Sequence, residues 1–314
     1  MSTIEQAAKR LEQLRQAGVG ASGKSLQTGD TAVPVEPEPL PLRVARKLES
    51  GDVAAAQSGA LGVNGTPEAR VASAQSRVEI DLARLSASGY ITPHAPRSRL
   101  AEEFRVIKRP LLMNARGKSA APVANANRIM ITSALAGEGK TYVAVNLAMS
   151  LASEFDTSVL LVDADATRPA VLSRLDLPPA KGLLDLLVDP GLSPESVVLA
   201  TNVERLSILP AGSQQTHATE LLASDGMSRL VQQLASGDPG RIVLFDTPPL
   251  LAATESRVLA AHMGQVVMVI AADETPQDSV TDALASVENC PVVVTLLNKT
   301  SPSGVGNYYG SYGA

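Results

Sequence analysis

The stretch from Ile131 to Ala148, ITSALAGEGKTYVAVNLA, constrains the fold of this chain more than any other. An apolar, β-prone run, residues 128–132, precedes its glycine-rich turn, and an apolar-periodic run with Val143, Leu147 and Leu151 on one face follows. Strand, glycine turn and helix in this order are the context of a phosphate-binding loop. Glycines let consecutive backbone N–H groups point at one anion, and the helix adds its positive dipole end. We therefore expect a nucleotide phosphate to bind here.

Two side chains of this loop, those of Lys140 and Thr141, are predicted to contact the nucleotide and its metal ion. The Lys140 ammonium is expected to reach the β- and γ-phosphates, and the Thr141 hydroxyl to hold Mg²⁺. The full pattern G-x-x-x-x-G-K-[ST] has a glycine where this chain has Ala134. The predicted ATP-binding residues of the loop are Gly137, Glu138, Gly139, Lys140, Thr141 and Tyr142.

A second stretch, residues 18–25, reads GVGASGKS and satisfies the full pattern. A polar helical stretch precedes it and LQTGDTAVPVEPEP follows it, so no predicted strand leads into it and no predicted helix follows. Because the motif is only a hypothesis without its structural context, we interpret these residues as linker sequence.

The rest of the chain divides into segments by composition and periodicity. Residues 1–17 predict an amphipathic helix that packs either on its own domain or on a partner, and 18–76 a flexible, Pro- and Gly-rich linker. Residues 77–126 form a regulatory and oligomerisation segment, with a helix from Arg97 to about Asn114 that Pro110 kinks or ends early. A nucleotide-binding domain over 127–300 and a Tyr-rich flexible tail over 301–314 complete the chain.

Apolar runs alternate with helical patterns through the nucleotide-binding domain. Because such βαβ alternation implies a parallel sheet, the predicted fold class is α/β, a P-loop NTPase-like, mostly parallel sheet with helices on both faces. The predicted strands are residues 128–132, 158–162, 206–210, 241–245, 265–270 and 291–297, and two of the helical patterns are residues 228–234 and 279–287.

Acidic residues end two of these predicted strands. The run at 158–162 is followed by Asp163 and Asp165, and the run at 241–245 by Asp246. Carboxylates at strand ends beside a phosphate loop are the usual way to hold the Mg²⁺ of a nucleotide, although a single such Asp can also be a helix N-cap. If the segment stays extended, Asp163 and Asp165 face the same way, so one can bind metal while the other accepts a proton. Arg168 is a candidate to balance phosphoryl charge or to form a surface salt bridge.

Composition excludes some classes of partner. The net charge of -5 presents no basic surface for nucleic acid. The single cysteine, Cys290, excludes an intrachain disulfide and is expected to be a buried structural thiol. No apolar run approaches the length of a membrane span, so we expect a cytoplasmic protein whose recruitment to the inner membrane depends on a partner.

Tyrosines gather at the end of the chain. Three of the five, Tyr308, Tyr309 and Tyr312, lie in GNYYGSYGA. With an ATP site upstream they are candidate phosphate acceptors, because a general base can activate a phenol that reaches the γ-phosphate; a docking strip is the alternative.

Apart from the linker, nearly the whole chain resembles the bacterial tyrosine kinases that control polysaccharide synthesis and export, and most of all the cytoplasmic autokinases that accompany exosortase systems. The resemblance is carried by SALAGEGKT at 133–141, LLVDADATRP at 160–169, LFDTPPLL at 244–251, LPAGSQQTHATELLAS at 209–224, RSRLAEEFRVIKRPLL at 97–112 and the Tyr-rich end. It implies Mg-ATP as the bound nucleotide, Asp165 and Asp246 as supports for Mg²⁺, and Asp163 as the base. It also implies phosphorylation of tail tyrosines between subunits of a ring, and activation by a membrane chain-length regulator of the Wzz type.

The sequence departs from the family pattern at two places. In the oligomer motif E-x-x-R-x-x-R, Glu102 and Arg105 match but Lys108 replaces the last arginine and lacks its bidentate fork. The family also has an arginine shortly after the second acid; Thr167 occupies that position in this chain, and the arginine follows at Arg168.

Two alternatives stay open from the sequence. A partitioning or division-site ATPase would carry a lysine where this chain has Leu135, and a non-catalytic nucleotide sensor would not need the three acids. Asn298, at the end of the last predicted strand, is expected near the adenine.

Overall fold

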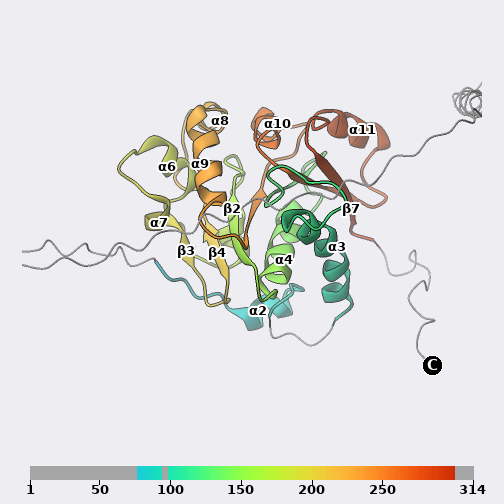
Figure 1. Ribbon diagram of the computed structural model, residues 1–314, viewed down its shortest axis with the longest axis horizontal. Coiled ribbons are helices and arrows are strands. Elements are labelled where there is room, and N and C mark those ends of the chain that lie inside the picture. Colours follow the sequence, from blue (N-terminus) through green and yellow to red (C-terminus); the bar gives the residue numbers. More distant parts are fainter. Residues whose placement is uncertain (1–75, 94–97, 301–314) are drawn as a thin grey trace, which may run out of the picture. The chain divides into compact units, whose positions relative to one another are not determined.

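The computed structural model of the protein describes residues 76–93 and 98–300 (Figure 1). The predicted helix at 1–17, the linker up to residue 75, the second glycine motif and the tail tyrosines lie outside the described residues. Within the described part, no helix combines the length and apolarity needed to cross a bilayer.

A seven-stranded sheet forms the centre of the fold, in the order β3-β4-β2-β5-β1-β6-β7. Neighbouring strands are parallel except β3, which runs antiparallel to β4. This confirms the predicted mostly parallel α/β sheet; the two-residue β3 is the strand that the sequence analysis missed. The strands are β1 (Arg128–Ser133), β2 (Ser158–Asp163), β3 (Leu199–Ala200), β4 (Leu206–Leu209), β5 (Arg241–Asp246), β6 (Gln265–Ala271) and β7 (Val292–Asn298).

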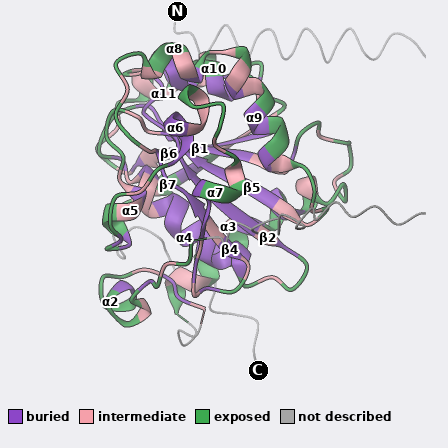
Figure 2. Cartoon of the chain, turned by 90° about the vertical axis from the view of Figure 1, so that its left-hand side faces the viewer, coloured by how far each residue is buried: buried purple, intermediate pink, exposed green. Residues whose placement is uncertain are grey.

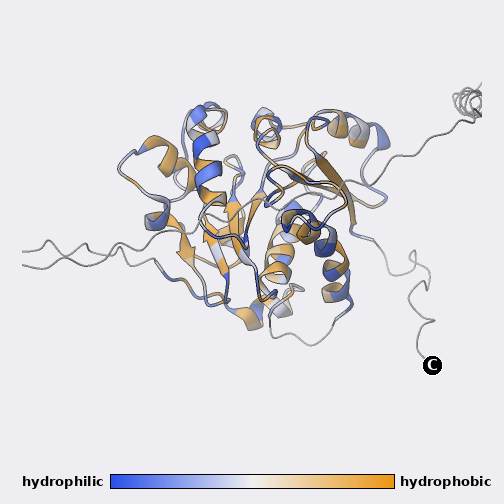
Figure 3. Cartoon of the chain, in the orientation of Figure 1, coloured by the Kyte–Doolittle hydropathy of each residue, from blue (hydrophilic) through white to orange (hydrophobic). Residues whose placement is uncertain are grey.

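Helices cover both faces of this sheet, and each face has its own apolar cluster (Figures 2 and 3). Alternate residues of β1 point to opposite clusters, with Ile129 and Ile131 in one and Met130 in the other. This explains why β1, β2 and β5 are continuous apolar runs, as strands buried on both faces must be. The helices are α2 (Leu82–Ala87), α3 (Arg99–Ala115), α4 (Lys140–Ala152), α5 (Val171–Arg174), α6 (Leu183–Val188), α7 (Pro194–Val197), α8 (Ala218–Leu222), α9 (Asp225–Ala235), α10 (Thr254–Ala260) and α11 (Gln277–Ala285).

The segment before α3 packs on the nucleotide-binding domain. Ile80 and Leu85 are buried in the same cluster as β1 and α4. Two asparagine side chains hold the backbone here: Asn202 accepts from the Ile80 amide at 2.9 Å, and Asn146 accepts from the Ile91 amide at 2.7 Å. Residues 76–93 therefore belong to the core of the described domain.

Helix α3 continues through Pro110 to Ala115, which confirms the predicted helix and, of the two effects expected of Pro110, excludes the early end. Proline removes the amide that would donate to the carbonyl of Val106. Because Val106 is 59% exposed, this carbonyl lies on the solvent side of the helix, where water can replace the lost donor. The opposite face, with Phe104 and Leu111, is buried against α4 and keeps the helix in place.

Lys108 has an intrachain role that the oligomer motif did not suggest. It is 7% exposed, and its Nζ donates to the carbonyl of Ser150 at 2.6 Å and pairs with Glu154 at 2.8 Å. The ammonium thus binds α3 to the C-terminal end of α4, where carbonyls lack helical partners and the dipole favours a cation. Glu102 and Arg105, in contrast, pair with each other on the exposed face of α3.

We expect Lys108→Ala to lower the free energy of unfolding by about 2 kcal/mol, because it leaves a half-buried carboxylate and a buried carbonyl without their partner. Arg99→Ala is the matched control: it removes an exposed ion pair with Glu103 in the same helix and should cost less than about 0.5 kcal/mol. Urea denaturation measures both values. Equal, small losses would show that Lys108 does not hold the two helices together.

Candidate functional site

The loop between β1 and α4 has the backbone of a phosphate cradle. Gly137 and Gly139 have φ of 85° and 96°, in the left-handed region that favours glycine, and α4 begins directly at Lys140. A Cβ on Gly139 would also lie 2.2 Å from Nδ2 of Asn298. The loop therefore turns its amides and the N-terminus of a helix of 13 residues toward one point at the carboxyl edge of the sheet.

The side chains of Glu138, Thr275 and Asn298 hold this loop in shape. The Glu138 carboxylate accepts from the amide of Leu135 at 2.6 Å and from the hydroxyl of Thr275. The Asn298 side chain donates to the carbonyl of Glu138 at 2.9 Å. Glu138 and Asn298, both predicted to bind ATP, therefore fasten the loop to the segments that follow β6 and β7. Thr275 was missed; its position just beyond the carboxyl end of β6 was the available signal.

Removing the Thr275 hydroxyl should loosen the loop without unfolding the domain. Thr275→Val keeps the shape of the side chain but loses the bonds to Glu138 and to the Ala271 amide. We expect KM for ATP to rise about three- to tenfold, which corresponds to the net free energy of one typical hydrogen bond. Thr281→Val, in the same part of the chain, is the control and should leave KM unchanged. A loss of stability with an unchanged KM would contradict the loop role.

The carboxylates of β2 and β5 meet beside this loop. Asp163 and Asp246 are register partners on adjacent strands, and Asp246 is also opposite Ile131 of β1. Asp246 is 1% exposed, and among the described residues neither of its carboxylate oxygens has a hydrogen-bond partner. Burial raises the pKa of Asp246 to about 7; the nearby Thr141 hydroxyl opposes this rise and the charge of Asp163 adds to it. Such a carboxylate lacks a partner, and a bound cation can be that partner.

Asp163 differs from Asp246 in having three backbone donors. Its oxygens accept from the amides of Asp165 at 3.2 Å, Ala170 at 3.0 Å and Val171 at 3.0 Å. Burial raises the pKa of Asp163 to about 6, while these three amides act against that rise. Strand β2 ends at Asp163 and the chain then turns, so the condition under which Asp163 and Asp165 would face the same way is not met.

Lys140 lies among three acidic side chains. Burial lowers the pKa of its ammonium, while Asp246, Asp165 and Glu138 raise it. The lysine is 9% exposed, so these charges act through little water. The site thus holds a buried cation against several carboxylates, an arrangement that suits phosphate together with a divalent cation.

The remaining predicted residues lie at the margins of this site. The amide of Arg168 donates to the Asp165 carboxylate at 2.8 Å. The Arg168 side chain is exposed, on the turn that follows β2. The Tyr142 hydroxyl donates to the carbonyl of Gly89 at 2.9 Å, and its ring packs against Tyr90 with centroids 4.9 Å apart. The side chain of Tyr142 therefore supports Gly89 and Tyr90.

The donor set fits magnesium. Among the residues described, His, Cys, Asp and Glu form no cluster of three that could enclose a metal ion. Mg²⁺ does not need one, because it keeps several waters and binds through one or two protein oxygens plus substrate phosphates. The unpartnered carboxylate of Asp246 and the neighbouring Thr141 hydroxyl supply such oxygens.

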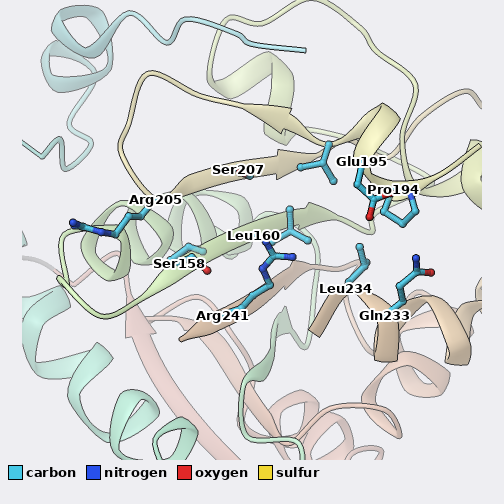
Figure 4. Close-up of a pocket in the computed structure, with 11 residues that line it drawn as sticks. Ser158, Leu160, Pro194, Glu195, Arg205, Ser207, Gln233, Leu234 and Arg241 are labelled. Carbon is cyan, nitrogen blue, oxygen red and sulfur yellow. The ribbon is translucent and has the colours of Figure 1, made fainter. Parts of the chain in front are cut away.

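A cavity of about 220 Å³ lies elsewhere, on the face of β2, β4 and β5 that α7 and α9 border (Figure 4). Ser158 and Arg241, which line it, are the first residues of β2 and β5, and Arg205 directly precedes β4. This cavity is at the amino edge of the sheet, whereas ligands of parallel α/β sheets bind at the carboxyl edge. Cys290 is buried at 8% exposure, as the sequence predicted.

Comparison with known proteins gives the following relatives. Residues 126–291 match the AAA domain family. Tyrosine-protein kinase YwqD of Bacillus subtilis (strain 168) is 30% identical over 220 residues, which are 69% of this chain and 89% of YwqD. The succinoglycan biosynthesis transport protein ExoP of Rhizobium meliloti (strain 1021) is 31% identical over 223 residues; this chain covers 69% of its own length and 27% of ExoP. The solved kinase domain of VpsO is 30% identical with a TM-score of 0.53, over 65% of this chain and 100% of that one.

Proposed function

Because the chain belongs to the family of bacterial tyrosine-protein kinases, we propose that it is an autokinase that transfers the γ-phosphate of Mg-ATP to Tyr308, Tyr309 and Tyr312 of its own tail. The proposal rests on one observation above all: the glycine loop, buried Lys140 and the unpartnered Asp246 converge at the carboxyl edge of the sheet. The clustered tail tyrosines supply acceptors of the matching chemistry.

In the proposed mechanism, the loop amides and Lys140 bind the phosphates. Thr141 and Asp246, with Asp165 nearby, would hold Mg²⁺, which when bound neutralises charge on the phosphate oxygens. Asp163, ionised at neutral pH with a pKa near 6, accepts the phenol proton as the tyrosine oxygen bonds to the γ-phosphorus and the β,γ-bridging oxygen leaves with ADP. A carboxylate offers about four acceptor positions. Three backbone amides occupy three of them on Asp163, and the remaining position can accept the phenol proton. Arg168 would face the transferred group.

The transfer takes place between copies in this proposal. Glu102 and Arg105, exposed on α3, belong to the surface at which subunits of a ring-shaped homo-oligomer meet. The named role of ExoP in succinoglycan biosynthesis and transport supports a role in polysaccharide chain length and export. A cytoplasmic kinase of this kind would be activated, and brought to the inner membrane, by the cytoplasmic segment of a Wzz-type chain-length regulator.

Mixing two variants tests transfer between copies. One copy carries Lys140→Met and an intact tail, and the other is active but carries Phe at all three tail tyrosines. Incubated with Mg-ATP, the mixture should contain phosphotyrosine on the tail of the Lys140→Met copy, and neither variant alone should contain it. Wild-type labelling together with an unlabelled mixture would contradict transfer between copies.

A further inference from the structure

A basic groove lies along the second half of α3, well separated from the phosphate loop. It encloses about 490 Å³, and we call it the α3 groove. Its charged lining consists of Arg105, Lys108, Arg109, Arg116, Lys118 and a single acid, Glu154. This concentration of positive charge contrasts with the net charge of -5 of the whole chain. An anionic occupant therefore suits the groove better than a neutral or basic one.

Some cations of the groove have partners within the described residues, and two others have no ion pair there. Lys108 pairs with Glu154, which neutralises the one acid of the groove, and Arg116 donates a single bond to the hydroxyl of Thr157 at 2.9 Å. Arg109 and Lys118 are exposed and form no ion pair with any residue in the described ranges. The groove thus keeps two exposed cations, with an arginine fork beside them, for an external anion.

The lining is not only charged. Leu112 is buried at 7% exposure, and Met113 is 43% exposed, so both add apolar surface to the cations. A phosphate on a flat apolar ring matches this combination: the ring contacts Met113 and Leu112 while the phosphate meets the guanidinium and ammonium groups. Inorganic phosphate or a carboxylate side chain would leave the apolar part of the lining without a contact.

We propose that the α3 groove binds phosphotyrosine of residues 301–314, so that it reads the product of the kinase. This inference rests on the proposed function, because phosphotyrosine in that segment is the product of the proposed transfer. Tyr308 follows Thr300, the last described residue, by eight positions. An extended chain of this length spans roughly 27 Å. Asn298, two residues before Thr300, donates to the carbonyl of Glu138 in the phosphate loop. Helix α4 has 13 residues, or about 20 Å, and leads from this loop toward Glu154 in the groove, so the tail of this chain or of a second copy can reach the groove.

Binding of a synthetic peptide tests the inference without kinase activity. The peptide has the sequence of residues 301–314 with phosphate on its three tyrosines, and the protein is the full chain carrying Lys140→Met and Phe at its own tail tyrosines. We expect saturable binding by calorimetry, and at least about tenfold weaker binding of the unphosphorylated peptide, because charge-assisted bonds to phosphate are lost. Arg109→Gln with Lys118→Gln should weaken phosphopeptide binding about tenfold. Lys181→Gln with Arg229→Gln, exposed elsewhere, is the matched control and should not weaken it.

Two further comparisons distinguish the occupant. Phosphoserine in place of phosphotyrosine, and Met113→Gln in the protein, should each weaken binding several-fold if the ring contacts the groove. Equal affinity for phosphorylated and unphosphorylated peptide would overturn the inference. So would Arg109- and Lys118-dependent binding to phosphatidylglycerol vesicles without binding of the phosphopeptide, which would make the groove a membrane contact. Because the peptide is phosphorylated chemically, an inactive kinase would refute the proposed function and leave this binding result independent.

Discussion

Lys140→Met is expected to lower the rate of tyrosine phosphorylation by about a thousandfold. The ammonium is the cation that the structure buries beside the loop and places among Asp246, Asp165 and Glu138. In phosphoryl transfer, where catalysis is mostly positioning and charge stabilisation, loss of such a fixed charge costs on the order of 10² to 10⁴ in rate. Methionine keeps the length and most of the volume of the side chain, so the domain should stay folded.

An initial-rate assay of phosphotyrosine formation, normalised to folded protein by circular dichroism, measures this effect. Lys181→Met is the control, because Lys181 is exposed and lies outside the site; it should keep wild-type activity. Activity of the Lys140 variant within tenfold of wild type would show that another group binds the γ-phosphate.

Asp246→Asn is expected to affect stability and function in opposite directions. A buried carboxylate without hydrogen-bond partners destabilises the nucleotide-free protein, so removing its charge should stabilise the fold, while removing the proposed metal ligand should weaken Mg-ATP binding by about a hundredfold. Asp163→Asn should instead destabilise the fold, because backbone amides donate to both carboxylate oxygens and one of these oxygens becomes an amide nitrogen that cannot accept.

The stability gain of Asp246→Asn should grow with pH. The folded pKa of Asp246, about 7, lies above the usual value of 3.8, so the folded state binds the proton more tightly than the unfolded state. Wild-type stability attributable to this group is therefore full below about pH 4, falls as the pH rises, and reaches its minimum above pH 7. The gain should be larger at pH 8 than at pH 5 by on the order of 2 kcal/mol. Denaturant titrations in EDTA at both values measure it; an equal gain at both would contradict the buried charge.

The sheet could be predicted from sequence because its signal is local. Strands buried on both faces appear as continuous apolar runs, and the runs at 128–132, 158–162 and 241–245 correspond to β1, β2 and β5 within one residue at either end. The proximity of Asp163 and Asp246 could be predicted as well, because the carboxyl ends of parallel strands lie at the same edge of the sheet.

Other features depend on contacts that no local pattern carries. The continuation of α3 through Pro110 is decided by burial of its inner face on α4, which outweighs one missing hydrogen bond. Thr275 acts only because β6 lies beside β1 and brings it to Glu138. The same applies to Lys108, which looks like a surface motif residue until α4 is packed against it. Each depends on a partner far away in the sequence.

Mapping of phosphate by mass spectrometry decides whether the protein is a tyrosine autokinase. Purified wild-type protein is incubated with Mg-ATP, alone and with the cytoplasmic segment of a Wzz-type regulator, and digested. We expect phosphate on Tyr308, Tyr309 or Tyr312 of the wild type, and none on these residues in Lys140→Met. Release of inorganic phosphate without phosphotyrosine, even with the regulator segment present, would contradict this expectation and favour an ATPase switch of the partitioning type.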